Sequence, residues 1–132
     1  MTARRNLSSG APWEQAVGYS RAVAAGDTIW VSGCTSIVDG EVVHVGDHYA
    51  QMVQAIRNVR WALEQLNASL DDVVRTRIFV TDISQWDEYG RAHGEAFGQV
   101  QPATSMVQIV ALVDPRMLVE VEAVAYKPGA GG

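Results

Sequence analysis

The stretch MLVEVEAVAY, residues 117–126, is a predicted strand with apolar side chains on both of its faces. Successive side chains of a strand point to opposite faces, so every second residue shares a face. One face carries Val119, Val121, Ala123 and Ala125. The other face carries Leu118, Glu120, Glu122, Val124 and Tyr126. Since neither face is purely polar, the pattern predicts a strand that is covered on both sides.

Two amphipathic helices are predicted before this strand. In the first, Asp47 is the expected N-cap and Asn67 the expected C-terminal stop. Apolar residues three and four positions apart form one stripe along it: Tyr49, Met52, Ile56, Val59, Leu63 and Leu66. The second helix is predicted over residues 84–98, with Ser84 as its N-cap.

The other strands complete an α+β arrangement. They are predicted at residues 19–25, 28–36, 41–45, 73–82 and 105–112. Turn signals at Gly26-Asp27 and Asp39-Gly40 separate the first three. Two helices can cover only one face of so wide a sheet. The helix-free face carries apolar residues as well, so we expect it to be buried against other copies of the chain.

Length and composition favour one globular domain: 132 residues, of which 48% are hydrophobic and 19% charged. Residues 1–16 are expected to form a loose N-terminal arm, and residues 128–132 a flexible tail. No run approaches the roughly 20 apolar residues that span a bilayer, so no membrane partner is expected. The single cysteine, Cys34, excludes an internal disulfide and suits a reducing compartment, which predicts a cytoplasmic location.

Charge and motifs disfavour several classes of protein. The net charge is −5 and the basic residues are scattered, which argues against a nucleic-acid partner. His44, His48 and His93 show no metal-ligand spacing, and the glycines form no phosphate-binding loop. Cys34 lies in a predicted strand without a recognisable histidine partner, which favours a buried packing role over that of a nucleophile.

The carboxylates are the more informative groups. Glu120 and Glu122 lie two residues apart on one strand face, which places their Cα atoms roughly 6.5–7 Å apart. A carboxylate in a half-buried cleft has a raised pKa and can act as a general acid or base near neutral pH. The alternative is a solvated or salt-bridged pair, with Arg75 and Arg77 on another strand as partners. The spacing alone leaves both interpretations open.

Five segments of the chain resemble, in order, motifs of the Rid family, the reactive intermediate deaminases, also called the YjgF family. VGYSRAV resembles G-P-Y-S-Q-A, and IWVSGCTS resembles I-x-x-S-G-Q. ALEQLNASLDDVVRTRIFVTDISQWDEY is similar to A-G-x-x-x-x-D-V-V-K-x-x-V-F-V/L-x-D-M/I-x-D-F/Y. PATSMVQIVAL resembles P-A-R-S/T-x-V-x-V-x-x-L-P, and VEVEAVA resembles I-E-I/V-E-A/V-I/V-A. The resemblance runs from about Gly18 to Lys127, nearly the whole chain.

The resemblance implies a chorismate-mutase-like α+β fold and a homotrimer whose three ligand clefts lie between subunits. That assembly agrees with the buried helix-free face expected from the strand pattern. The best-known branch of the family hydrolyses small enamines and imines to keto acids and ammonia. It uses no cofactor, so none is expected here.

The site residues that the resemblance implies are Tyr19, Ser32, Gly33, Cys34, Thr104 and Glu120. Glu120 falls where the family's glutamate positions or activates the attacking water, so it is the predicted catalytic residue. The other five are predicted to bind the substrate. Cys34 stands where the family has glutamine, and Thr104 stands where the deaminases have the arginine that clamps the substrate carboxylate. The family's proline before Tyr19 is also missing, whereas Asn58 does match.

These departures leave three hypotheses for the function. The first is a hydrolase of the deaminase type with an altered substrate, which is neutral or is anchored elsewhere. Backbone N–H groups near Cys34 and Thr104 would then hold a polar oxygen. In one version of this hypothesis, Arg21 or Arg77 supplies the missing cation from another strand. The second is a non-catalytic trimer that binds a metabolite or a partner protein. The third is an endoribonuclease, a label attached to some relatives, and the acidic charge balance counts against it.

Overall fold

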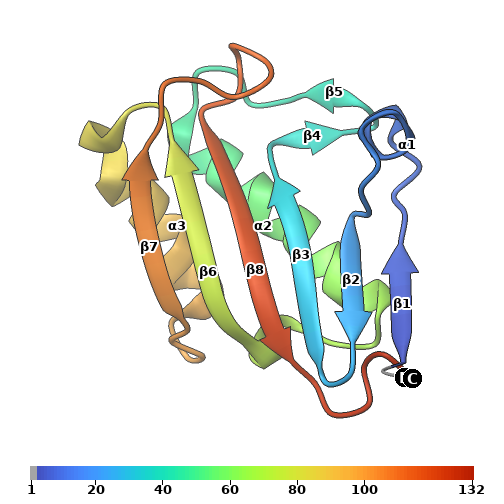
Figure 1. Ribbon diagram of the computed structural model, residues 1–132. Helices are drawn as coiled ribbons and strands as arrows, with labels where there is room; N and C mark the ends of the chain where they lie inside the picture. Colours follow the sequence, from blue (N-terminus) through green and yellow to red (C-terminus); the bar gives the residue numbers. More distant parts are fainter. Residues whose placement is uncertain (1–2) are drawn as a thin grey trace.

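A computed structural model describes residues 3–132 as a six-stranded sheet with its two long helices on one face (Figure 1). The strand order is β1-β2-β3-β8-β6-β7, and only β6 and β7 are parallel neighbours. The sheet strands are β1 (Arg4–Leu7), β2 (Ala22–Ala25), β3 (Thr28–Cys34), β6 (Val73–Val80), β7 (Ala103–Gln108) and β8 (Val119–Tyr126). The helices are α1 (Pro12–Val17), α2 (His48–Gln65) and α3 (Trp86–Phe97). The predicted mixed α+β sheet is therefore confirmed.

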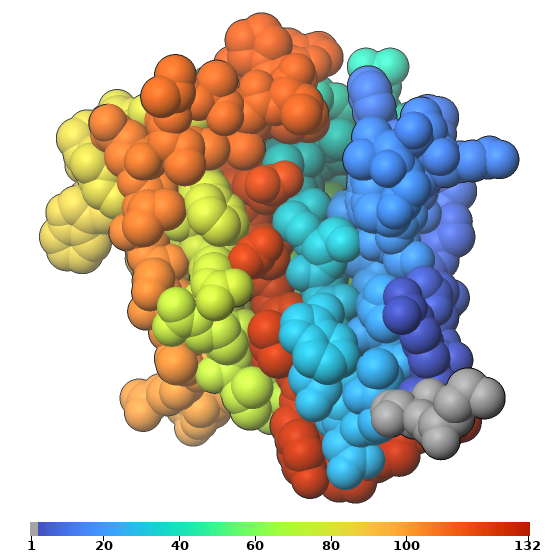
Figure 2. Space-filling view, in the orientation of Figure 1, coloured from blue at the N-terminus to red at the C-terminus, as the bar shows by residue number. Residues whose placement is uncertain are grey.

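The alternation in β8 divides the molecule into a core and a helix-free face. Val119, Val121, Ala123 and Ala125 are all buried and face α2 and α3. They meet buried residues of β3 and β6, among them Ile29 and Ile78. Burying a valine or isoleucine side chain contributes about 1.5–3 kcal/mol, so this face holds the fold together. Figure 2 shows the opposite, helix-free face, which is hollowed along β8.

The first long helix begins and ends as its sequence predicts. The Asp47 side chain accepts a hydrogen bond from the backbone N–H of Ala50, which satisfies a donor that the first turn leaves free. At the other end Asn67 has a φ of 62°, the left-handed conformation that ends a helix. Its apolar stripe is buried at Met52, Ile56 and Val59.

The second long helix begins later than predicted. Asp82 accepts hydrogen bonds from both the backbone and the hydroxyl of Ser84, so the Ser84 side chain is a partner of this cap and not the cap itself. A 3-10 turn, η2 (Ile83–Gln85), follows, and α3 starts only at Trp86. A second short turn, η1 (Leu70–Asp72), leads into β6.

The N-terminal segment differs from the loose arm that its sequence predicts over residues 1–16. Met1 and Thr2 lie outside the described residues, but β1 joins the sheet as its edge strand, antiparallel to β2. The Glu14 carboxylate of α1 accepts hydrogen bonds from the hydroxyls of Ser8 and Ser9, which ties the helix to the end of β1. These contacts link side chains that follow no helical or strand periodicity, so no pattern in residues 3–17 predicts the strand or the helix.

The chain end has turn structure that its small residues do not suggest. The backbone N–H of Gly131 donates to the carbonyl of Gly26 in the β2–β3 turn. Ala130 is buried, and its carbonyl accepts a hydrogen bond from Arg5. The predicted tail thus packs against β1 and the β2–β3 turn.

Two other predicted strands have different bounds. The strand expected at 41–45 is the short β5 (Glu41–Val42), which pairs with β4 (Ile37–Val38) in a separate small hairpin. The strand expected at 105–112 is β7, which starts at Ala103 and ends at Gln108. The apolar residues after it form a loop in which Val110 and Val113 are almost fully exposed. Among residues 3–132, no helix is both long and apolar enough to cross a membrane.

Candidate functional site

The six predicted site residues fall into three places. Tyr19, Ser32, Gly33 and Glu120 lie at the helix-free face near β2, β3 and β8, whereas the Cys34 side chain lies in the core. Thr104 lies on the edge strand β7, at the other end of the sheet. One copy of the chain therefore places four of the six residues on the same face of the sheet.

Glu120 lies directly over the backbone of Gly33. A Cβ atom at position 33 would lie 2.5 Å from Glu120 Cδ and 2.7 Å from Oε1. The register between β3 and β8 shifts between Val31 and Cys34, which is where the carboxylate crosses the strand. A glycine is thus required at position 33 to leave room for the carboxylate, which explains why a strand otherwise rich in side chains has none there.

We expect Gly33→Ala to lower any turnover that depends on the Glu120 carboxylate by about 10-fold or more, with little loss of stability. The φ of Gly33 lies outside the left-handed region, so alanine can adopt it. The three atoms nearest to the new methyl group all belong to the Glu120 side chain, which must therefore move aside. A displacement of a catalytic group by about 1 Å can cost roughly 100-fold. Turnover and thermal unfolding of the variant check this, and a Gly33→Ala/Glu120→Gln double variant should be no worse than Glu120→Gln alone.

Burial tunes the electrostatics of Glu120. Partial burial raises the pKa of its carboxyl above the ordinary 4.5, the positive charge of Arg21 opposes this, and the negative charge of Glu122 adds to it. The net result is a raised pKa, which moves the carboxyl toward the range in which a side chain exchanges protons at neutral pH.

Tyr19 and Ser32 line an open hollow of about 450 Å³ that is also bordered by residues of β1, α1 and β2. The Ser32 hydroxyl donates to the carbonyl of Ser20 at 2.7 Å, so its hydrogen is already committed while its oxygen can still accept. The Tyr19 ring lies under the guanidinium of Arg21, whose central carbon is 5.6 Å from the ring centroid. An aromatic ring and a hydroxyl therefore border the hollow, together with the charged side chains of Arg4 and Glu14.

The side chain of Cys34 points away from this hollow. It is fully buried, and burial raises the pKa of its thiol to about 11. A thiol that stays protonated and sealed from solvent is a poor nucleophile, which agrees with the packing role favoured from the sequence. At the helix-free face only the backbone of Cys34 can contribute to binding.

Thr104 is connected to a network that the sequence did not reveal. Thr76 Oγ1, which is fully buried, donates to Thr104 Oγ1 at 2.7 Å and shares a hydrogen bond of 2.9 Å with His93 Nε2. Burial lowers the pKa of the His93 imidazole. The only signal in the sequence is that Thr76 and His93 occupy inward positions of an otherwise apolar strand and helix. The hydrogen bond between them gives both side chains a partner within the chain.

Thr104 also faces the wrong way to meet Glu120 in the same chain. It pairs with the buried Thr76, whereas its neighbour Ser105 pairs with Arg77 on the helix-free face. Glu120 lies on that helix-free face, and β6 separates its strand from β7. The position that holds a clamping arginine in the deaminases is therefore out of reach of Glu120 within one copy.

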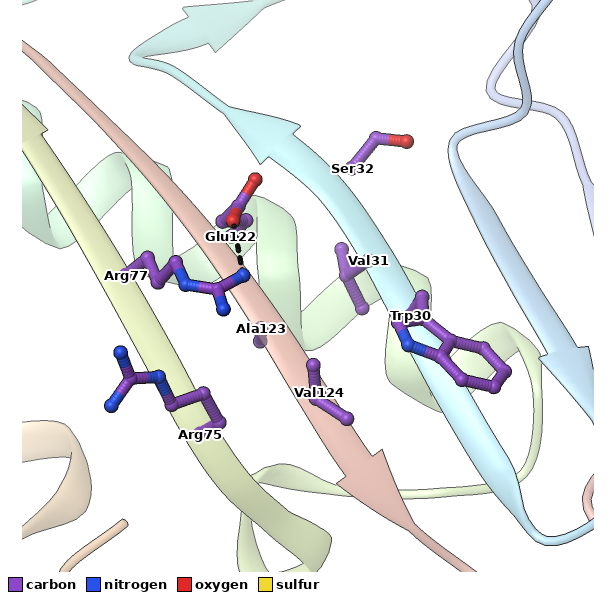
Figure 3. Close-up of a pocket in the computed structure, with 8 residues that line it drawn as sticks. All are labelled: Trp30, Val31, Ser32, Arg75, Arg77, Glu122, Ala123 and Val124. Carbon is purple, nitrogen blue, oxygen red and sulfur yellow. Dashed lines mark hydrogen bonds and ion pairs between the residues drawn. The ribbon is translucent and has the colours of Figure 1, made fainter. Parts of the chain in front are cut away.

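A second hollow, of about 200 Å³, lies along β3, β8 and β6 (Figure 3). Arg77 and Glu122 lie opposite each other across the strands and form an ion pair of 3.2 Å. Arg75 donates to the hydroxyl of Ser105. The salt-bridge interpretation of the carboxylate pair thus holds for Glu122 and not for Glu120, and both arginines of β6 already have partners.

Asn58, which matches the family pattern, lies on α2 and holds the segment that follows β3. Its side-chain amide donates to the carbonyls of Thr35 and Ile37 at 2.9 and 3.0 Å, which fixes the chain as it leaves β3. In residues 3–132 no three histidine, cysteine or acidic side chains come together in a way that could hold a metal ion.

Comparison with known proteins agrees with this fold. The family described as endoribonuclease L-PSP matches residues 10–127. The chain belongs to this family, the YjgF or Rid family. A crystal structure of a Mycobacterium tuberculosis member of the YjgF/YER057c/UK114 family is 50% identical and superposes with a TM-score of 0.86, covering 94% of this chain and 99% of that one.

Two curated relatives extend the comparison. An uncharacterized protein of Streptomyces coelicolor is 37% identical over 93% of this chain and 92% of its own length. The 3-aminoacrylate deaminase RutC of Acinetobacter baylyi is 33% identical over 82% of this chain and 86% of its own. These YjgF-family relatives include an enzyme that removes ammonia from a small enamine acid.

Proposed function

We propose that this YjgF-family protein hydrolyses a small imine or enamine to a carbonyl compound and ammonia, in clefts between copies of the chain. The observation that carries this is the half-buried carboxylate of Glu120 over Gly33, with its raised pKa. The similarity to a 3-aminoacrylate deaminase supports the same class of reaction.

The chemistry needs one group that takes and returns a proton. As water attacks the iminium carbon, the Glu120 carboxylate accepts a proton from it, a C–O bond forms, and the C=N electron pair moves to nitrogen. Glu120 then protonates the amine, the C–N bond breaks, and ammonia leaves as the hydroxyl becomes a carbonyl and loses its proton. A carboxyl whose pKa is raised toward neutrality suits both steps.

A homotrimer is the assembly that we propose. In one copy the edge strand β7 with Thr104 cannot reach Glu120, so a complete cleft requires β7 from a second copy. The helix-free face also exposes apolar side chains, among them Trp30, Val107 and Tyr126. Contact with another copy would cover them.

Replacing Thr104 with arginine tests what this position does. We expect the native protein to release ammonia from freshly generated 2-iminopropionate faster than buffer does, and Thr104→Arg to raise the rate by about 10-fold, the effect of one charged hydrogen-bonding group. Glu120→Gln is the inactive control. A native protein with no activity above buffer, and a Thr104→Arg variant equally inactive, would contradict the proposal.

The loss of the arginine also supports a second candidate, a trimer that binds a metabolite or a partner without turnover. Thr104 offers a hydroxyl already hydrogen-bonded to Thr76 and carries no charge, so it cannot clamp a carboxylate. The two functions differ in the outcome of Glu120→Gln. A protein that only binds its ligand would keep its ligand affinity in this variant, and its ammonia release would not depend on Glu120.

A further inference from the structure

We propose that Arg21 holds the carboxylate of a small substrate beside Glu120, and so replaces the arginine that is absent at position 104. The carboxylate is that of the imine acid whose hydrolysis is proposed above, so the catalytic meaning of Arg21 rests on that function. The binding of a carboxylate by Arg21 can be measured without turnover.

The backbone places Arg21 on the same face as Glu120. Its N–H donates to the carbonyl of Leu7, and its own carbonyl accepts from the N–H of Ser32, so it is fixed between β1 and β3. The next residue, Ala22, is buried in the core. Arg21 therefore directs its side chain to the helix-free side, next to Ser32 and Gly33, where the Glu120 carboxylate crosses the strand.

The guanidinium of Arg21 forms no ion pair within 4.0 Å with any acidic side chain of residues 3–132. The ion pairs formed by arginines within residues 3–132 use Arg60, Arg77, Arg91 and Arg116. The Nε of Arg21 is buried and has no hydrogen-bond acceptor among the described residues. Stacking over the Tyr19 ring holds the guanidinium in place. A buried donor without an acceptor is costly to a fold, and a bound carboxylate would supply the acceptor.

The chemistry of a guanidinium fits this role. Its planar fork donates two parallel hydrogen bonds to a carboxylate. The positive charge of Arg21 opposes the rise in the pKa of Glu120 and of Cys34, and it contributes to the lowered pKa of Glu14, as expected for a guanidinium near the helix-free end of β3. A 2-imino acid carries its reacting carbon next to its carboxylate. Anchoring the carboxylate on Arg21 thus presents that carbon toward Glu120.

The sequence around Arg21 agrees with a change of anchor. The family segment G-P-Y-S-Q-A has a glutamine at the position of Arg21, and the family segment P-A-R-S/T has an arginine at the position of Thr104. This chain has a positive charge at the first of these positions and none at the second. The two arginines of β6 are less suitable, because Arg77 is paired with Glu122 and Arg75 with Ser105. Arg4, which lines the hollow beside Tyr19, already donates to the side chain of Asn6.

Equilibrium binding of pyruvate and of its neutral analogue pyruvamide tests the role of Arg21. We expect the native protein to bind pyruvate more tightly than pyruvamide. Arg21→Gln should lower the affinity for pyruvate by about 10- to 100-fold and leave the affinity for pyruvamide nearly unchanged. Arg21→Lys keeps the charge but not the planar fork of donors, so its affinity for pyruvate should lie between those of the native protein and Arg21→Gln. The matched control Arg60→Gln removes an exposed arginine of α2 and should bind as the native protein does.

A measurement on the native protein covers the case in which the variants fail to fold. Phenylglyoxal modifies accessible arginines, and peptide mapping should show that pyruvate protects Arg21 while Arg60 reacts regardless. No pyruvate binding by the native protein, equal affinity for pyruvate and pyruvamide, or unchanged pyruvate affinity in Arg21→Gln would overturn the role of Arg21. Pyruvate binding through Arg21 without ammonia release would instead support the anchor and contradict the deaminase.

Discussion

Glu120→Gln is expected to lose at least about 100-fold of any ammonia-releasing activity and to unfold at a slightly higher temperature than the native protein at pH 7. Removal of a positioned general acid or base typically costs 10²–10⁴-fold, which sets the first effect. The second arises because glutamine fills the same space without a buried charge. The two readouts move in opposite directions, which a merely misfolded variant cannot reproduce.

The pH dependence of stability follows from the raised pKa of Glu120. Its carboxyl binds a proton more readily in the folded state than in the unfolded state, where the pKa is about 4.5. Its contribution to folding is therefore fully present below pH 4.5 and is lost as the pH rises through the folded pKa. The gain from Glu120→Gln should appear above that window and vanish at lower pH. The side chain is only partly buried, so solvent screening keeps the gain small.

The rate of turnover should also depend on the ionisation of Glu120, but in the opposite direction to the stability. The attacking water needs an ionised carboxylate, so kcat/KM of the native protein should fall as the pH drops through the raised pKa of Glu120. Rates and thermal unfolding measured from pH 4 to pH 8 check both effects. A Glu120→Gln variant that keeps native turnover, or whose stability differs most at the lowest pH, would contradict the assignment.

The sequence predicts the sheet well because its decisive signals are local. The alternation in residues 117–126 separates core from helix-free face, and Asp47 and Asn67 bound the first long helix as observed. The N-terminal strand and helix have no such signal. They are held by hydrogen bonds to Glu14 and by pairing with β2, contacts that depend on the rest of the fold.

The site is predictable only in part. The spacing places Glu120 and Glu122 on one face, but it does not indicate which carboxylate is ion-paired. The cross-strand register decides this, since it sets Arg77 opposite Glu122 while Gly33 makes room for Glu120. The link from Thr104 through Thr76 to His93 joins three elements, so no sequence window contains it.

Gln51 shows what a helical pattern cannot reveal, and Gln51→Leu should destabilise the fold by about 3 kcal/mol or more. Gln51 stands among the polar positions of α2, yet it is fully buried. Its amide donates to the carbonyls of Arg116 and His44, and its carbonyl accepts from the N–H of Leu118 at 2.9 Å. Leucine is of similar size but offers none of these bonds.

The loss is large because it leaves backbone groups buried without partners. Each unsatisfied buried donor or acceptor costs about 1–3 kcal/mol, and Gln51 serves three. These groups fix the residues that lead into β8, so the variant should also disturb the position of Glu120. Urea unfolding of Gln51→Leu, with the exposed Gln65→Leu as a control within about 0.5 kcal/mol of native, measures the effect. Equal stability of the two variants would show that water replaces the Gln51 amide, and that the entry to β8 is held by its apolar contacts alone.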